Sequence, residues 1–251
     1  MKKPRISKII TILFAACILT ACGVQKDTVP QVPARPEILV ETPEELSNNM
    51  LPALDIAALE SAMTKEDYAA FAEYLPVLRG EETFCWVAGP YRGYPDYDWK
   101  SRDVTLEEFH CELWGDNEHK TETLLLDRLA MQDIDGDGGS ELVLLVQDMA
   151  YNYLILSYKD DTVYGTDLYV RWFGDLQRNG VYVGSGGAGD QTYYQMAFRN
   201  ERFEQQELGH KSEWATGCEC TIDGEPVTKE SFDDWLEKTM VGEVIWYLPE
   251  E

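Results

Sequence analysis

The stretch from Asp133 to Glu141 constrains the fold more than any other part of the chain, because it places four carboxylates and three glycines within nine residues. Carboxylates at alternate positions repel one another unless a cation lies between them; without one, their pKa values rise and the loop loses order. An aliphatic run from Leu142 to Val146 follows directly, and such a short run bounded by turn residues is typical of a buried strand. The stretch therefore predicts a metal-binding loop that leads into a buried strand.

The residue types in this loop favour calcium, because Ca²⁺ takes about six to eight oxygen ligands in a flexible geometry. In EF-hand numbering Gly138 holds position six, where the chain turns sharply, but Leu144 stands at position twelve, where a bidentate Glu is required. We therefore expect a weak, structural site with a Kd of ~10⁻⁴–10⁻³ M. An acidic hairpin turn without a metal is the alternative. The predicted Ca²⁺ ligands are the side chains of Asp133, Asp135, Asp137 and Glu141 and the backbone carbonyl of Gly139.

The sequence Asp-Ile-Asp-Gly-Asp-Gly-Gly-Ser-Glu-Leu at residues 133–142 resembles the calcium loops of FG-GAP-type repeats and of many bacterial surface lipoproteins, in which strands flank the loop. The resemblance implies that the carboxylates ligate the metal and that Gly139 contributes its carbonyl oxygen. FG-GAP propellers repeat this motif, whereas the chain carries one copy, so the resemblance does not extend to a propeller.

The amino-terminal segment carries the features of an export signal. Four basic residues precede the apolar segment Ile9–Leu19, which is too short for a comfortable transmembrane helix. The segment ends in Leu-Thr-Ala-Cys at residues 19–22, which resembles a bacterial lipobox and implies a lipidated Cys22. We therefore predict a lipoprotein signal peptide at residues 1–21 and a lipid anchor that holds the protein on the extracytoplasmic face of the cell membrane. A plain signal peptide cut near Ala21 is the alternative.

Residues 22–41 form a predicted Pro-rich tether, because prolines at every third position (Pro30, Pro33 and Pro36) favour an extended backbone. Residues 42–251 then form a predicted single α+β domain. Removing the signal peptide takes away four cations and no acidic residue, so the formal net charge changes from −25 to −29. Such a charge repels phosphates, which argues against nucleic-acid binding and leaves membrane attachment to the lipid.

The cysteines that remain after processing leave three interpretations open. Four thiols in an exported chain permit disulfides in three pairings, and Cys218 and Cys220 are too close in sequence to pair easily with each other. A zinc site from this C-x-C pair with His210, with or without His110, is the second interpretation. Free, buried thiols are the third. The candidate disulfide or thiol residues are Cys85, Cys111, Cys218 and Cys220.

Helix signals dominate the first half of the domain and strand signals the second. Helices are predicted from Thr42, over Leu54–Met63, from Thr64 to a stop at Pro76, from Thr105 to about Trp114 and from Thr228 to Lys238. Strands are predicted at Thr83–Val87, Leu126–Met131, Leu142–Gln147, Tyr153–Lys159, Val163–Arg171, Val181–Val183, Tyr193–Phe198, Phe203–Leu208, Cys218–Ile222 and Val244–Leu248, with a helical turn at Trp172–Leu176.

Short turns between neighbouring strands, such as Asp160-Asp161, favour an antiparallel β-meander with N-terminal helices and one late helix packed on it. This order of elements is similar to that of a group of uncharacterised lipoproteins from anaerobic gut bacteria, and the similarity implies no activity.

The functional prediction is a membrane-anchored, non-enzymatic lipoprotein with a structural calcium site that binds a cell-wall glycan or a peptide. The aromatic loop Gly89–Trp99 is a candidate contact surface, although large aromatic side chains are more often buried. The alternative is an extracytoplasmic hydrolase acting on glycan or peptide through a carboxylate pair that no local motif identifies. The glycine-rich segment Gly184–Asp190 lacks both the P-loop ending and the serine-hydrolase elbow, so it is interpreted as a hairpin loop.

Overall fold

The computed structural model describes residues 56–87, 89, 100–113, 125–147, 152–214 and 217–247. All of them belong to the compact unit Glu41–Glu251. The predicted signal peptide, the lipidation site at Cys22, the tether, the helix start at Thr42 and the aromatic loop other than Gly89 lie outside the described residues.

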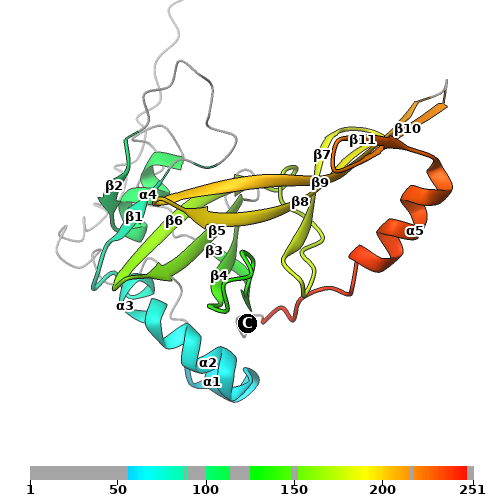
Figure 1. The fold of residues 1–251 in the computed structure, drawn as a ribbon. Coiled ribbons are helices and arrows are strands. Elements are labelled where there is room, and N and C mark those ends of the chain that lie inside the picture. Colours follow the sequence, from blue (N-terminus) through cyan, green and yellow to red (C-terminus); the bar gives the residue numbers. More distant parts are fainter. Residues whose placement is uncertain are drawn as a thin grey trace, which may run out of the picture. The chain divides into compact units, whose positions relative to one another are not determined.

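A six-stranded sheet with the strand order β2-β1-β6-β5-β4-β3 forms the first half of the architecture (Figure 1). Strands β3 to β6 are an antiparallel meander, as predicted, whereas β1 adds to the edge of β6 in parallel, which the sequence did not indicate. The strands are β1 (Phe84–Trp86), β2 (Arg102–Val104), β3 (Leu125–Gln132), β4 (Glu141–Gln147), β5 (Asn152–Lys159) and β6 (Thr162–Tyr169).

A five-stranded antiparallel sheet follows, with the strands in the order β11-β10-β9-β8-β7. The meander therefore continues along the chain but divides into two sheets. The α+β class is confirmed. The strands of the second sheet are β7 (Val181–Gly187), β8 (Asp190–Arg199), β9 (Arg202–Trp214), β10 (Gly217–Ile222) and β11 (Glu225–Val227).

The N-cap residues predicted from the sequence are found at the starts of helices in the structure. Thr64 Oγ1 accepts the amide of Asp67 at 3.0 Å, and Thr105 and Glu108 form the predicted reciprocal capping box. The predicted stop near Leu75 is wrong, because Pro76 occupies the first turn of a new short helix, where its missing N–H costs nothing. The helices are α1 (Ile56–Ala62), α2 (Lys65–Phe71), the 3₁₀ helix η2 (Ala72–Tyr74), α3 (Leu75–Leu78), α4 (Leu106–Leu113) and α5 (Lys229–Thr239).

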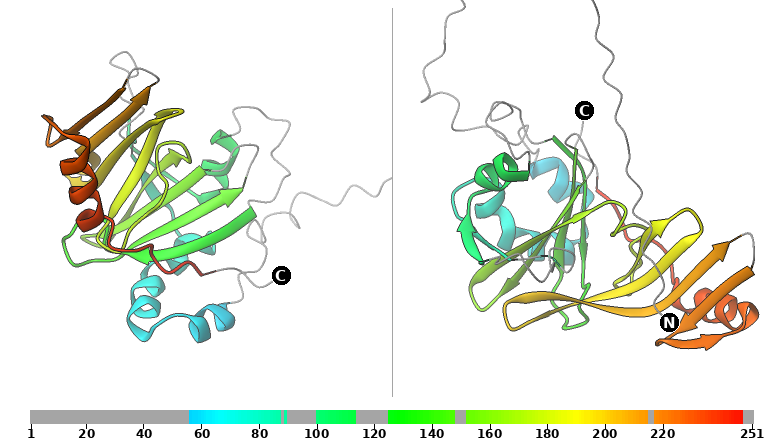
Figure 2. Two further views of the ribbon diagram at one scale, coloured as in Figure 1. Left: turned by 90° about the vertical axis from the view of Figure 1, so that its right-hand side faces the viewer. Right: turned by 90° about the horizontal axis from the view of Figure 1, so that it is seen from above.

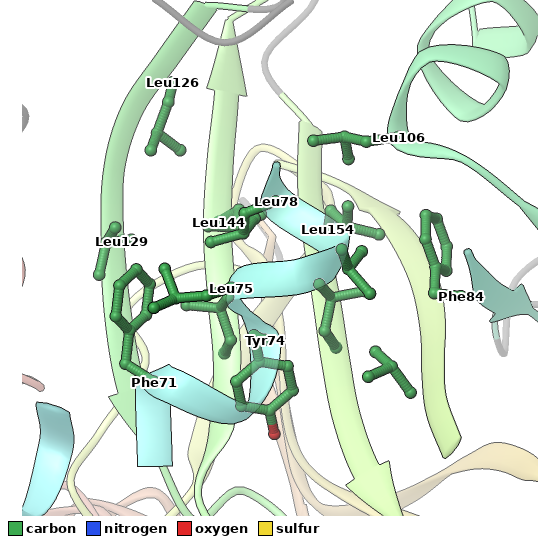
Figure 3. Close-up of a cluster of buried hydrophobic side chains, with 14 of the residues drawn as sticks. Phe71, Tyr74, Leu75, Leu78, Phe84, Leu106, Leu126, Leu129, Leu144 and Leu154 are labelled. Carbon is green, nitrogen blue, oxygen red and sulfur yellow. The ribbon is translucent and has the colours of Figure 1, made fainter. Parts of the chain in front are cut away.

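The first sheet is covered on both faces, which explains its continuous aliphatic strands. Side chains at alternating positions of β4 enter different clusters: Leu144 packs toward the N-terminal helices and Val143 toward the opposite face. Figure 3 shows Phe71 and Leu75 from the helices lying over Leu129 and Leu144 of the sheet. The opposite face packs against side chains of the second sheet, among them Tyr182, Met196 and Phe203.

One face of the second sheet carries helix α5, which lies against β10 (Figure 2). Phe232 of the helix is fully buried beside Tyr193 and Cys220. Thr228 caps the helix by accepting the amide of Ser231 at 3.2 Å, as predicted. Among the described helices, none has the length and apolar character needed to cross a bilayer.

Two further predicted elements need correction. Residues 172–176 form a bent turn held by a bridge between Gly174 and Val183, not a helical turn. Residues 244–247 contain no strand, and one isolated bridge, between Tyr247 and Leu129, joins this segment to the first sheet.

Candidate metal centre

The acidic loop joins β3 to β4, and Gln132 and Glu141 face each other across its base. Gly136 and Gly138 have φ angles of +76° and +93°, in the left-handed region that favours glycine. These two glycines let the chain reverse direction within the loop, so the turn predicted at Gly138 is confirmed.

The carboxylates of the loop accept hydrogen bonds from its own amides. Asp133 accepts the N–H of Gly136 at 2.7 Å through Oδ1 and that of Gly138 at 3.0 Å through Oδ2. Asp135 Oδ1 accepts the N–H of Asp137 at 3.1 Å. These hydrogen bonds hold the carboxylates of Asp133 and Asp135 in the loop even though the two groups repel each other.

Three of the predicted ligands come together. One carboxylate oxygen from each of Asp133, Asp135 and Glu141 lies within 4.8 Å of the other two, so these residues could hold a metal ion. Asp137 is not part of this group; its Oδ1 accepts the amide of Gly139 at 2.8 Å and its Oδ2 contacts Lys159. Ligation by Asp137 and by the carbonyl of Gly139 stays a prediction.

Glu141 is the most buried carboxylate of the cluster, with 2% of its surface exposed. Its Oε2 accepts the amide of Ile134 at 2.8 Å, and its Oε1 accepts the hydroxyl of Ser157 at 3.0 Å. Burial raises the pKa of Glu141 to about 7, against these hydrogen bonds, and the nearby charge of Asp135 adds to the rise. The site therefore holds a carboxylate that is only partly ionised near neutral pH.

Lys159, at the end of β5, belongs to the candidate site, and the sequence did not identify it. Its Nζ lies 3.7 Å from Asp135 Oδ2 and 3.5 Å from Glu141 Oε1, and it donates a hydrogen bond to Asp137. Burial alone would raise the pKa of Asp137, but the hydrogen bonds from Lys159 and Gly139 lower it below its usual value. Burial keeps the pKa of Asp135 above its usual value despite the ammonium.

The loop also connects the two sheets. The amide of Phe198 in β8 donates to Asp135 Oδ2 at 3.4 Å, and Gln132 Nε2 donates to the carbonyl of Arg178 at 2.8 Å. Ile134, 1% exposed, enters the cluster between the sheets. The candidate site thus lies where the first sheet meets the second.

A buried tyrosine supports the loop from the helical side. The hydroxyl of Tyr74 donates to the carbonyl of Ser140 at 2.8 Å and accepts the amide of Tyr158 at 3.2 Å. Burial, together with the charge of Glu141, raises the pKa of Tyr74 far above its usual value, so this hydroxyl stays a donor.

Of the three interpretations of the cysteines, the structure agrees with free thiols at three of the four positions. Cys85, Cys218 and Cys220 are free thiols, and Cys85 packs in a different cluster from the other two. His210 pairs with Thr221 across the strands whereas Cys220 pairs with Lys211, so His210 points to the opposite face of the sheet. His210 Nε2 instead lies 2.5 Å from Asp190 Oδ1.

His110, the other histidine considered for zinc, is buried on α4. Of the described residues, only the acidic cluster groups three metal-ligating side chains.

Comparison with known proteins found no matching family model, no matching curated protein and no matching solved structure.

Proposed function

We propose that the domain binds one Ca²⁺ ion through Asp133, Asp135 and Glu141, and that the ion stabilises the connection between the two sheets. The observation that carries this proposal is the convergence of three carboxylate oxygens within 4.8 Å at a loop that contacts both sheets. The donor set consists of oxygen alone, which suits a hard cation and not a soft one.

The charge balance supports a cation at this position. Lys159 brings one ammonium to a group of four carboxylates, so it leaves most of their charge uncompensated. A divalent cation would favour the ionised form of Glu141 and displace the proton that burial retains. Metal binding is then coupled to proton release.

The surroundings of Glu141 favour a structural role over catalysis. Both oxygens of this carboxylate are engaged by Ile134 and Ser157, and the side chain is shielded from solvent, so it is not presented to a substrate. A weak site, with a Kd of ~10⁻⁴–10⁻³ M, suits a protein that works where calcium is abundant.

Calorimetric titration and thermal unfolding test the calcium site. With a Kd near 10⁻⁴ M, about 10 mM Ca²⁺ stabilises the protein by roughly 2.7 kcal/mol, or about 5–10 °C in Tm, relative to protein in EDTA. Asp135→Ala abolishes both the heat and the shift. Asp223→Asn, in the exposed turn between β10 and β11, is the matched control and leaves both unchanged. Absence of heat and of any Tm shift in the wild-type protein overturns the proposal.

We also propose that the chain is exported and anchored on the extracytoplasmic membrane face by lipidation of Cys22. The support is the lipobox-like sequence Leu-Thr-Ala-Cys at residues 19–22 behind a basic and an apolar segment. Fractionation of cells that express Cys22→Ala tests this: the wild-type protein stays with the membrane and the variant is released. A variant that stays in the membrane fraction contradicts the anchor.

The partner of the anchored domain is proposed to be a cell-wall glycan or a peptide. The formal net charge of −29 after removal of the signal peptide favours neutral or basic partners over nucleic acid. Glycan and peptide arrays with and without EDTA identify the class of partner. Cleavage of a bound glycan or peptide during the assay would instead favour the hydrolase alternative.

A further inference from the structure

Two cysteines on β10 lie side by side under helix α5. Cys218 and Cys220 are two residues apart on one strand, so their side chains share a face of the sheet. Their Sγ atoms are 3.1 Å apart, about 1 Å more than a disulfide bond of ~2.05 Å. Small side-chain rotations would bring the two sulfurs to bonding distance.

The backbone geometry permits a bond but does not favour a permanent one. Two residues of an extended strand have Cα atoms about 6.4–6.8 Å apart, at the upper end of the ~4.4–6.8 Å that disulfides span. Strand β11 pairs with Cys220, Thr221 and Ile222 and does not reach Cys218, so the strand can adjust there on one side. A bond at the limit of its span is typical of an exchangeable disulfide and not of a structural one.

The two thiols have different surroundings. Cys220 is 5% exposed and packs with Phe232 and Tyr193, whereas Cys218 is half-buried. Burial, together with the hydrogen bond to Cys218, raises the pKa of Cys220 to about 11. Cys218 is therefore the thiol that an incoming reagent meets first.

The charged side chains near Cys218 and Cys220 form ion pairs, so positive and negative charges are balanced there. Lys211, which pairs with Cys220 across the strands, is bound to Glu213 at 2.9 Å. Lys229 in the first turn of α5 is bound to Asp233 at 2.8 Å. Because these pairs balance each other, a neutral or a weakly charged disulfide can approach the thiols.

We propose that Cys218 and Cys220 form a dithiol–disulfide exchange site whose substrate is a low-molecular-weight disulfide. The Cys218 thiolate attacks one sulfur of the substrate, which forms a mixed disulfide and releases the first thiolate. Cys220 then loses its proton to solvent and attacks Cys218, which closes the Cys218–Cys220 bond and releases the second thiolate. The two cysteines lose two electrons and two protons, and the substrate disulfide is reduced to two thiols.

Equilibration of the full chain in glutathione buffers tests the site. The ratio of oxidised to reduced glutathione is varied over roughly four decades, and the disulfide is followed by thiol alkylation and peptide mass spectrometry. We expect reversible formation of the Cys218–Cys220 disulfide, with its midpoint inside that range. A pair that stays reduced throughout, or that is protected by a bound metal without forming a bond, overturns the proposal.

Variants separate the roles of the two thiols. Cys220→Ser retains a glutathione adduct at Cys218 that the wild-type protein resolves, whereas Cys218→Ser forms an adduct at Cys220 at least tenfold more slowly. The double variant Cys85→Ser/Cys111→Ser is the control and keeps the wild-type midpoint. Equal adduct rates at the two positions contradict the assigned order, and oxidation that requires Cys85 or Cys111 contradicts the site.

Discussion

The two sheets differ in how much of their surface is covered. In the first sheet all five residues from Leu142 to Val146 are buried, because helices cover one face and the second sheet covers the other. In β8 of the second sheet only Tyr193 and Met196 are buried among ten residues. The first sheet is therefore the stable scaffold, and the second is a partly open surface attached to it.

This difference fits the separate tasks that we propose for the two regions. The acidic loop begins at the edge of the well-packed sheet, where Glu141 is held without solvent and its pKa is raised. The thiol pair of Cys218 and Cys220 lies on the open sheet, under one helix, where one sulfur remains accessible. A buried carboxylate suits a structural ion, whereas a half-exposed thiol suits exchange with a reagent from solution.

The largest expected effect comes from matched leucine truncations in the two sheets. Leu154→Ala in β5 removes a fully buried side chain and lowers the free energy of unfolding by about 2–5 kcal/mol. Leu208→Ala in β9 removes a half-buried side chain and costs about 1 kcal/mol, since less apolar surface returns to water. Urea unfolding followed by fluorescence measures both. Equal losses would mean that the second sheet is as well packed as the first.

The next largest expected effect is the change with pH in the free energy of unfolding of the metal-free protein, measured in EDTA. The folded state raises the pKa of Glu141 from 4.5 to about 7, so the folded protein holds a proton that the unfolded chain releases. The contribution of Glu141 is therefore fully present below pH 4.5 and falls by about 3 kcal/mol as the pH rises through 7. The Glu141→Gln variant does not show this decrease in stability, and Ca²⁺ makes the decrease smaller in the wild-type protein. Parallel pH profiles for wild type and variant contradict the assignment.

Replacement of Lys159 tests whether its ammonium group competes with Ca²⁺ for the carboxylates of the acidic loop. Because Lys159 contacts two of the proposed ligands, Lys159→Met strengthens Ca²⁺ binding by roughly tenfold and destabilises the metal-free protein. Lys229→Met, at an exposed pair on α5, is the control and leaves Ca²⁺ affinity unchanged. Calorimetry gives the affinities. Weaker calcium binding in Lys159→Met would show that the ammonium supports the site and does not compete.

The last expected effect concerns Tyr74, which contacts the loop from the helical side. Tyr74→Phe removes the hydroxyl between Ser140 and Tyr158 and leaves two backbone groups without this partner, which costs about 1–2 kcal/mol. The same change lowers Ca²⁺ affinity slightly, because Ser140 precedes Glu141. Thermal unfolding with and without Ca²⁺ measures both effects. An unchanged Tm would mean that water replaces the hydroxyl.

The secondary structure could largely be predicted, because its signals are local. Thr64, Thr105 and Thr228 begin helices where their caps were expected, and the acidic turn at Asp160 and Asp161 has positive φ angles that suit a hairpin. The division into two sheets and the parallel pairing of β1 with β6 were missed, because they depend on contacts between residues far apart in sequence. Pro76 misled the prediction since it also fits the first turn of a new helix.

The sequence alone determined the acidic cluster: the spacing of Asp133, Asp135 and Glu141, with glycines between them, brings three carboxylates together within one hairpin turn. Only the tertiary structure decided that Lys159 reaches the cluster and contacts Asp137, because the pairing of β4 with β5 brings Lys159 to the loop. The tertiary structure also decided that the Sγ atoms of Cys218 and Cys220 lie 3.1 Å apart. The extended backbone keeps the Cα atoms of these residues well apart, and the orientation of the two side chains under α5 brings the sulfurs together.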